Sequence, residues 1–185
     1  MTPRDLLRRA GVWLAFPGLL AAPGCGYALA GRGSNLPSYI QTVGVPLFAN
    51  RTTVFEVEQV LTERVRAEFI GRGKYRVVPV ATGVDARLDG AITSIAVAPS
   101  ALNEQGQATR YAVAFTLDIS FTDLKTNRVL WQNPALVFRE EYDVATVAGG
   151  SATDVAGFFG QSANALERIA NDCAKSIVSS ILEAF

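Results

Sequence analysis

The sequence predicts an α+β fold: a two-layer sandwich in which two amphipathic helices pack on one face of a mostly antiparallel sheet of four to five strands. Three observations predict this class. Residues 111–121 alternate apolar and polar side chains without a fault, shorter stretches of the middle region alternate similarly, and apolar residues recur every three or four positions in two other segments. The order β-α-β-β-β-β-α leaves an antiparallel meander with one apolar face, which two amphipathic helices can cover.

The N-terminal segment has the organisation of a secretory signal peptide. Arg4, Arg8 and Arg9 precede an apolar run over residues 10–22, which ends in small residues. At about thirteen residues this run is too short to span a bilayer, which takes roughly 20 apolar residues. We therefore expect residues 1–24 to be removed.

Cys25 directly follows this cleavage site and is the expected lipidation site. Its thiol can be alkylated by a diacylglycerol and its freed amine acylated, and each buried methylene of the added chains contributes about 0.8 kcal/mol to membrane binding. Ala22 and Pro23 depart from the usual lipobox, so plain secretion is the alternative. The chain is expected to have three segments: a lipoprotein signal peptide (1–24), a lipidated N-terminus and tether (25–37) and a single α+β domain (38–185).

Residues 40–48 are predicted to form the first strand of the domain. Val43, Val45 and Leu47 would share its buried face, because side chains two residues apart in a strand point to the same side. Pro46 has no amide hydrogen, which indicates an edge strand or a strand end.

The first helix is predicted to follow this strand directly. Residues 53–56 have the sequence Thr-Val-Phe-Glu, which matches a capping box, so we expect the helix to begin there and to run to about Ile70. Gly71 and Gly73 then end it. Its apolar residues fall at helical spacing: Val54, Val57, Leu61, Val65 and Phe69.

The middle of the chain is predicted to be a succession of strands. A change of apolar phase at Thr93 and Ser94 indicates a bulge, and Pro134 breaks or bulges the last strand. Residues 99–109 form a polar loop, and residues 123–128 form a hairpin turn. The predicted strands cover residues 75–80, 86–98, 111–121 and 129–142.

A second helical pattern runs from near Thr153 to the end of the chain. Cys173 lies on its apolar stripe, so we expect a buried, unpaired thiol; a Cys25–Cys173 disulfide is the alternative and requires Cys25 to be unmodified. The stripe consists of Val155, Phe159, Leu166, Ile169, Cys173, Ile177 and Ile181.

The composition argues against catalysis and against nucleic acid as a partner. The chain has no histidine, which removes the commonest general base, the commonest zinc ligand and every Ser-His or Cys-His nucleophile. We therefore expect no enzyme activity, no cofactor and no metal. Loss of residues 1–24 would reduce 17 basic and 17 acidic residues to 14 and 16, and this balance gives no basic face for nucleic acid.

A series of short motifs runs in order along the chain. They are Gly24-Cys25-Gly26-Tyr27-x-Leu29, Leu36-Pro37-x-x-Ile40, Val45-Pro-x-Phe-x-Asn50-Arg-Thr52, Glu58-x-x-Leu61-Thr62, Glu68-Phe69, and Asp118-x-x-Phe121 leading to Leu130-Trp131. This series resembles the LptE family of lipopolysaccharide-assembly outer-membrane lipoproteins. That family is similar in fold to the sandwich predicted above, with two helices against one face of the sheet.

The resemblance implies a non-enzymatic subunit of the lipopolysaccharide translocon. Such a subunit is lipid-anchored in the outer membrane, faces the periplasm or sits in the lumen of the LptD β-barrel, helps that barrel to assemble, and could receive lipopolysaccharide. A large barrel has a polar interior, so a compact domain of near-neutral charge suits its lumen.

Two other classes of envelope protein stay open. Residues 42–50 also resemble the opening strand of outer-membrane lipoproteins that activate cell-wall synthases or build secretion pores. The third class is a periplasmic lipoprotein that holds a lipid between sheet and helices, although the regular strand at residues 111–121 shows no sign of an enlarged cavity.

The resemblance also implies a site for lipopolysaccharide at the loop of residues 99–110. Some family members contact its phosphates through a basic residue at the loop tip. This chain departs from that pattern, because it has Asn103, Glu104 and Gln105 at the tip and Arg110 only at the base. Asn103, Gln105 and Arg110 are the contact candidates in the loop.

A second candidate site is the basic cluster of Arg72, Lys74 and Arg76. In an extended segment these alternate residues would lie on one side and suit a phosphate, although charges that protect a strand edge are the simpler interpretation. Glu140, Glu141 and Asp143 are expected to form a charged rim and not a cation site.

Overall fold

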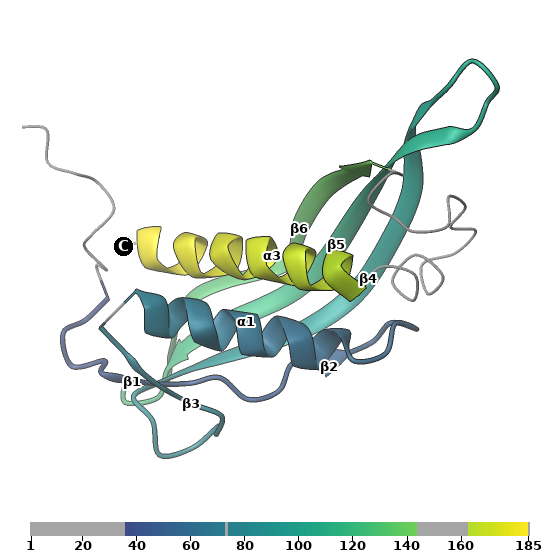
Figure 1. The fold of residues 1–185 in the computed structure, drawn as a ribbon. Coiled ribbons are helices and arrows are strands. Elements are labelled where there is room, and N and C mark those ends of the chain that lie inside the picture. The colour runs from purple at the N-terminus through teal and green to yellow at the C-terminus, as the bar shows by residue number, and fades with distance from the viewer. Residues whose placement is uncertain (1–35, 73, 144–162, 185) are drawn as a thin grey trace, which may run out of the picture. The chain divides into compact units, whose positions relative to one another are not determined.

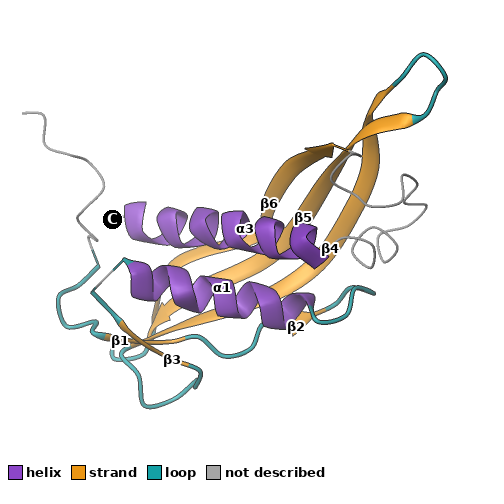
Figure 2. Cartoon of the chain, viewed as in Figure 1, coloured by secondary structure: helices purple, strands orange, loops and turns teal. Residues whose placement is uncertain are grey.

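The computed structural model describes residues 36–72, 74–143 and 163–184, which belong to one compact unit from Gly33 to Phe185. Two helices cover one face of a single sheet, so the predicted α+β sandwich is confirmed (Figures 1 and 2). No helix of the described segments is long and apolar enough to cross a membrane. The elements are β1 (Thr42–Gly44), β2 (Ala49–Asn50), α1 (Val57–Gly71), β3 (Arg76–Val78), β4 (Ala86–Leu102), β5 (Ala108–Asp123), β6 (Arg128–Asp143) and α3 (Ala163–Glu183).

The sheet has six strands, which is more than predicted, and it combines antiparallel with parallel pairs. Its order is β3-β1-β4-β5-β6, with β2 also beside β4. The long strands β4, β5 and β6 are antiparallel, whereas β1 pairs in parallel with β3 and β4. Because β1 and β3 are parallel, the chain between them must cross over the sheet, and α1 makes that crossover.

The predicted first strand is divided into two short strands. β1 ends at Gly44, and Pro46 lies between β1 and β2, which agrees with a strand end at this proline. Because the alternation is interrupted, Leu47 is 56% exposed instead of buried, and Phe48 takes the buried position. The Phe48 ring lies against Gly90 of β4, where a Cβ atom would come within 2.8 Å of it.

The predicted capping box at residues 53–56 is wrong, because α1 begins only at Val57. Glu56 is the N-cap residue, with a left-handed φ of 64° and no capping hydrogen bond from its side chain. Asn50 organises this turn instead, since its Nδ2 donates to the Val54 carbonyl at 2.8 Å and to the Glu58 carboxylate at 2.7 Å.

The β4–β5 hairpin is longer than predicted, and its tip extends past the N-terminal ends of the helices (Figure 1). The polar loop predicted at residues 99–109 shrinks to residues 103–107, because β4 continues through Pro99 to Leu102. A register shift between Ile92 and Ser94 confirms the predicted bulge in β4. A second register shift, between Leu117 and Ile119 of β5, lies opposite Pro134 of β6. A proline is tolerated there because β6 is an edge strand of the described sheet.

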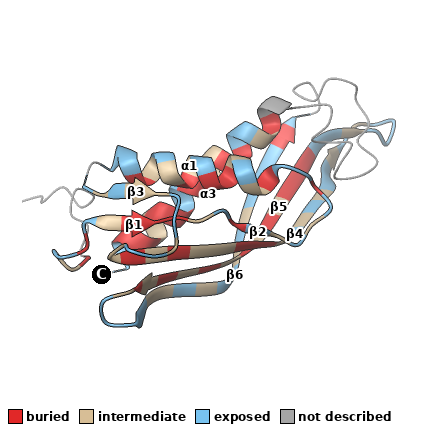
Figure 3. Ribbon diagram, turned by 90° about the horizontal axis from the view of Figure 1, so that it is seen from below, coloured by how far each residue is buried: buried red, intermediate tan, exposed pale blue. Residues whose placement is uncertain are grey.

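The hydrophobic core lies between the sheet and the two helices (Figure 3). β5 supplies alternate residues from Tyr111 to Phe121, as the sequence predicts. The predicted start of the second helix, near Thr153, lies outside the described residues, and α3 is described from Ala163. The buried faces of the helices are Val57, Leu61, Val65 and Phe69 of α1, and Ile169, Cys173, Ile177 and Ile181 of α3.

Candidate functional site

The tip of the β4–β5 hairpin presents neutral polar groups and one exposed carboxylate, that of Glu104. Asn103 has a structural role there, because its Oδ1 accepts hydrogen bonds from the amides of Gln105 at 3.1 Å and Gln107 at 2.8 Å. Gly106 completes the turn with a φ of 73°. Gln105 itself is exposed. The tip can therefore offer hydrogen bonds to a ligand, but its own residues carry no positive charge.

Arg110 is the third residue of β5, and its charge is balanced by two carboxylates of β6. Its Nε lies 3.0 Å from Asp143 Oδ1, and its Nη1 lies 3.4 Å from Glu141 Oε2. The hydrogen bond that Arg110 donates to Asp143, together with the charges of both acids, raises the pKa of the Arg110 guanidinium. Two residues of the predicted charged rim, Glu141 and Asp143, therefore form ion pairs with Arg110.

The basic residues Arg72, Lys74 and Arg76 do not form the predicted one-sided row. Arg72 lies at the end of α1, where its Nε bonds Glu68 at 2.9 Å and its Nη2 donates to Ser179 of α3 at 2.7 Å. Only Arg76 lies within a strand, since β3 begins there. The row fails because Arg72 is the C-cap residue of α1, with a helical backbone conformation, and is not part of an extended segment.

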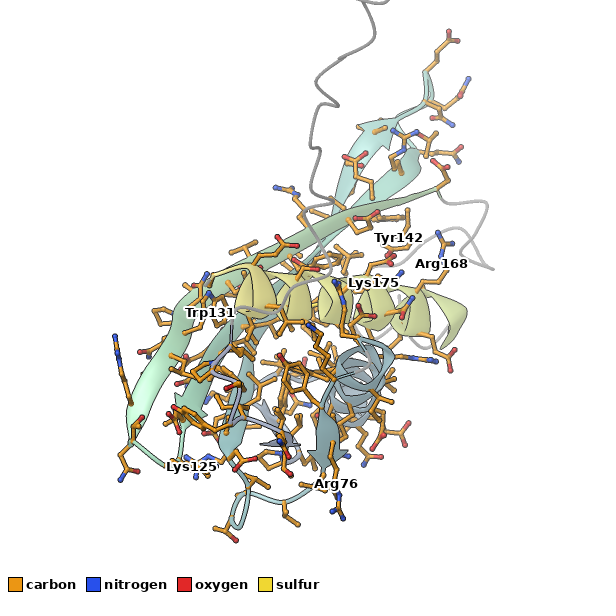
Figure 4. All side chains as sticks on the ribbon, turned by 90° about the vertical axis from the view of Figure 1, so that its left-hand side faces the viewer. Arg76, Lys125, Trp131, Tyr142, Arg168 and Lys175 are labelled. Carbon is orange, nitrogen blue, oxygen red and sulfur yellow. The ribbon has the colours of Figure 1, made fainter. Side chains whose placement is uncertain are left out.

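Lys74 and Arg76 nevertheless share one pocket at the edge of the sheet. β3 is the outermost strand beside β1, and both side chains are exposed. Arg76 projects away from the helices in Figure 4. The basic pair therefore combines two features that the sequence left as alternatives, an edge strand and a candidate anion site.

The sheet face opposite the helices carries mainly polar, charged and small side chains, together with the exposed Val129 and Val137. Its residues alternate with the core-facing ones along β4, β5 and β6, and none of them belongs to the hydrophobic core. We call this surface the outer sheet face. Its rows across the three strands are Arg87–Thr122–Val129, Asp89–Ser120–Gln132, Ser94–Thr116–Val137 and Ala96–Ala114–Arg139.

A polar cluster joins Tyr39, which precedes β1, to Asp85 and to the turn at residues 123–126. The sequence did not indicate this cluster. Asp123 accepts hydrogen bonds from the Tyr39 hydroxyl at 2.5 Å and from Thr126 Oγ1 at 2.7 Å, and Lys125 Nζ lies 2.8 Å from Asp85 Oδ1. The only signal in the sequence was an aspartate at the start of a predicted hairpin turn. Its partners come from distant segments, so the cluster fixes the segment before β1 to two turns.

Of the two cysteines, the structure describes Cys173. Cys173 is buried in α3, as predicted, and desolvation raises the pKa of its thiol to about 12, which keeps it neutral and unreactive. Cys25 lies outside the described residues, so its lipidation stays a prediction. Within the described segments, no three of His, Cys, Asp and Glu gather in a way that could hold a metal ion.

Two solved structures share this fold. Lipoprotein B from Nitrosomonas europaea superimposes with a TM-score of 0.52 at 14% identity, covering 85% of this chain and 90% of that one. The hypothetical protein CT253 from Chlamydia trachomatis gives 0.50 at 9% identity, covering 78% and 99%. No curated protein matches the chain. These likenesses define a class of small bacterial α+β domains by fold alone.

The family to which this chain belongs is shown by a match of its sequence to a family model. The model of the LptE family, described as lipopolysaccharide-assembly, matches residues 40–181, which include the six described strands, α1 and all but the last two residues of α3. The chain therefore belongs to the LptE family, a family of non-enzymatic lipoproteins of the cell envelope.

Proposed function

We propose that this protein is the lipid-anchored subunit of the outer-membrane lipopolysaccharide translocon, where it acts as plug and assembly factor for an LptD-type β-barrel. The family match over residues 40–181 carries the proposal, because it covers nearly the whole described domain. Lipid on Cys25 would hold the protein at the outer membrane. The residues between Cys25 and Leu36, which is part of the hydrophobic core, would serve as the tether.

The outer sheet face supports the role of a plug. The lumen of a large barrel is polar, so a domain inside it needs surfaces that make hydrogen bonds without burying an apolar patch. Three rows of this face centre on the hydroxyl residues Ser120, Thr116 and Thr122 of β5, which are short enough to let another sheet approach. Charges on this face partly compensate each other, since Arg87 pairs with Asp89 at 2.6 Å.

The role in barrel assembly does not require an ionic contact at the hairpin tip. Asn103 is held within its own turn and Arg110 is neutralised by β6, so the tip has no cation to offer to a phosphate. We infer that the tip contributes hydrogen bonds, through Gln105 above all.

Affinity purification of the full-length lipidated protein from detergent-solubilised outer membrane tests the proposal. A large β-barrel recovered in stoichiometric amount is the expected result, and depletion of this protein should reduce both the mature barrel and surface lipopolysaccharide. Recovery of a cell-wall synthase, or of a ring of this chain alone, would contradict it.

A further inference from the structure

A pocket of about 590 Å³ lies where β3 meets the segment that precedes β1. Its volume is within the range of ordinary small-molecule sites, which is about 300–1,000 Å³. Neither the outer sheet face nor the tip of the β4–β5 hairpin contributes a residue to it. It is lined by Leu36, Pro37, Ser38, Ile40, Gln41, Lys74, Tyr75 and Arg76.

The backbone on both sides of this edge pocket is fixed. Residues 37–40 form a tight turn, in which the Ile40 amide donates to the Pro37 carbonyl at 2.9 Å. The Arg76 amide donates to the Gln41 carbonyl at 2.8 Å, and this bond joins the two walls. The Tyr75 ring meets Phe69 edge to face at 6.3 Å, which anchors the second wall in the core.

The edge pocket has an apolar base and a basic rim. Leu36 and Ile40 are only 8% and 4% exposed, and Tyr75 is half-buried, whereas Lys74 and Arg76 are exposed. No acidic side chain is among the described lining residues. Arg76 forms no ion pair with any described residue, in contrast to Arg64, Arg66 and Arg87, each of which has a carboxylate within 3.1 Å.

We propose that the edge pocket binds an anionic amphiphile that carries a phosphate. The phosphate lies between Lys74 and Arg76, where charge-assisted hydrogen bonds are strongest and a guanidinium can bond two oxygens at once. The apolar stem lies against Leu36, Ile40 and Tyr75. Membrane phospholipids and the glycolipid of the outer leaflet share this chemistry, and the site does not depend on a barrel partner.

A charged strand edge is the competing explanation for the same residues. Lys and Arg on an edge strand prevent pairing with another chain, but that role needs no cavity and no apolar base beneath the cations. It predicts that substituting the two cations changes aggregation and leaves ligand binding unaffected.

An NMR titration of the ¹⁵N-labelled full chain in a nonionic detergent tests the proposal. The probes are dihexanoyl phosphatidylglycerol, its net-neutral phosphatidylcholine counterpart and inorganic phosphate. Phosphatidylglycerol should shift the amides of Gln41, Tyr75 and Arg76, and the double variant Lys74→Gln/Arg76→Gln should bind it on the order of tenfold more weakly. Arg51→Gln, which removes an exposed arginine that does not line the pocket, should bind like the parent chain.

Three results would overturn the proposal: equal binding of the net-neutral lipid, equal binding of inorganic phosphate, or shifts that the double variant leaves unchanged. Competition with purified lipopolysaccharide then identifies the source, since displacement at lower concentration than phosphatidylglycerol indicates the glycolipid and the reverse order indicates a phospholipid. Because the titration contains no barrel, failure to recover a barrel from membranes would leave its outcome unaffected.

Discussion

Asp123 is a carboxylate that remains charged although it is only 1% exposed. Burial by itself raises the pKa of this group, but hydrogen bonds from Tyr39, Thr126 and the amide of Lys125 lower it more, so the net shift is downward. The Asx-type bonds to Lys125 and Thr126 cap the β5–β6 turn, and the Tyr39 bond ties the segment before β1 to it.

Asp123→Ala should destabilise the domain by about 2–3 kcal/mol, because it removes the buried, charged acceptor that the hydrogen bonds from Tyr39, Lys125 and Thr126 share. Urea unfolding monitored by circular dichroism measures the effect. Tyr39→Phe removes only one of these bonds, at a partly exposed residue, and should cost less. Equal losses in the two variants would contradict the central role of Asp123.

Asp85 makes stability depend on pH in the acid range. Its hydrogen bond with Lys125, followed by those from the amides of Thr42 and Gln41, lowers its pKa from 3.8 to about 2. A folded-state pKa below the unfolded one contributes stability that is fully present above about pH 4 and is lost as the pH falls toward 2.

The free energy of unfolding of the parent chain should therefore fall more steeply between pH 4 and pH 2 than that of Asp85→Asn, which has no carboxylate to titrate. Urea unfolding at a series of pH values checks this. Curves that stay parallel over that interval would show that Asp85 has the same pKa in both states.

The short strands on the parallel side depend on close approach of the backbone. A Cβ atom at Gly44, the last residue of β1, would overlap the Val80 carbonyl oxygen and would lie 2.9 Å from the Val84 side chain. The first of these atoms belongs to the backbone, so it cannot move aside as a flexible side chain could. Gly71, at the end of α1, has no atom within 4 Å of the same position.

Gly44→Ala should therefore lower stability by about 1–3 kcal/mol, the usual range for forced overpacking. Gly71→Ala is the matched control and should be neutral or stabilising by up to about 1 kcal/mol, since alanine favours a helix over glycine. Thermal unfolding distinguishes the two variants. A Gly44→Ala protein as stable as the parent would mean that the loop around Val80 and Val84 moves freely.

At the scale of the whole molecule, the helices cover one face of the sheet and leave the outer sheet face to other contacts. The arrangement gives the domain an apolar core on one side and a surface of hydroxyl, charged and scattered apolar side chains on the other.

Thr116→Arg should reduce recovery of the β-barrel severalfold, because a long charged side chain in the middle of the outer sheet face prevents close approach of another sheet. Stability should change little, as expected for a surface substitution. Thr116→Ser keeps the hydroxyl and should leave recovery intact. Undiminished recovery with Thr116→Arg would show that the barrel contacts another face.

Cys25→Ala should abolish lipidation and release the protein from the membrane fraction, since the acyl chains supply the binding energy. Mass spectrometry of the N-terminal peptide and cell fractionation provide the measurements. Cys173→Ala is the control and should retain the lipid even if the smaller side chain lowers stability. A Cys25→Ala protein that stays in the membrane fraction would indicate a different anchor.

Regular, strongly periodic elements were predictable from the sequence, and irregular ones were not. β5, the bulge in β4 and the buried position of Cys173 follow from periodicity alone. The capping box failed because Asn50, six residues before Glu56, organises the start of α1. Leu47 was misplaced because alternation predicts a face only while the strand continues.

The sequence by itself determined the fold class, the family and the expected anchor, because apolar periodicity and short motifs are properties of neighbouring residues. Only the tertiary structure decided which distant groups meet. Tyr39 bonds Asp123 across 84 residues, and the edge pocket joins residues 36–41 to Lys74 and Arg76. Such pairs depend on how strands and turns pack in space, which local pattern does not encode.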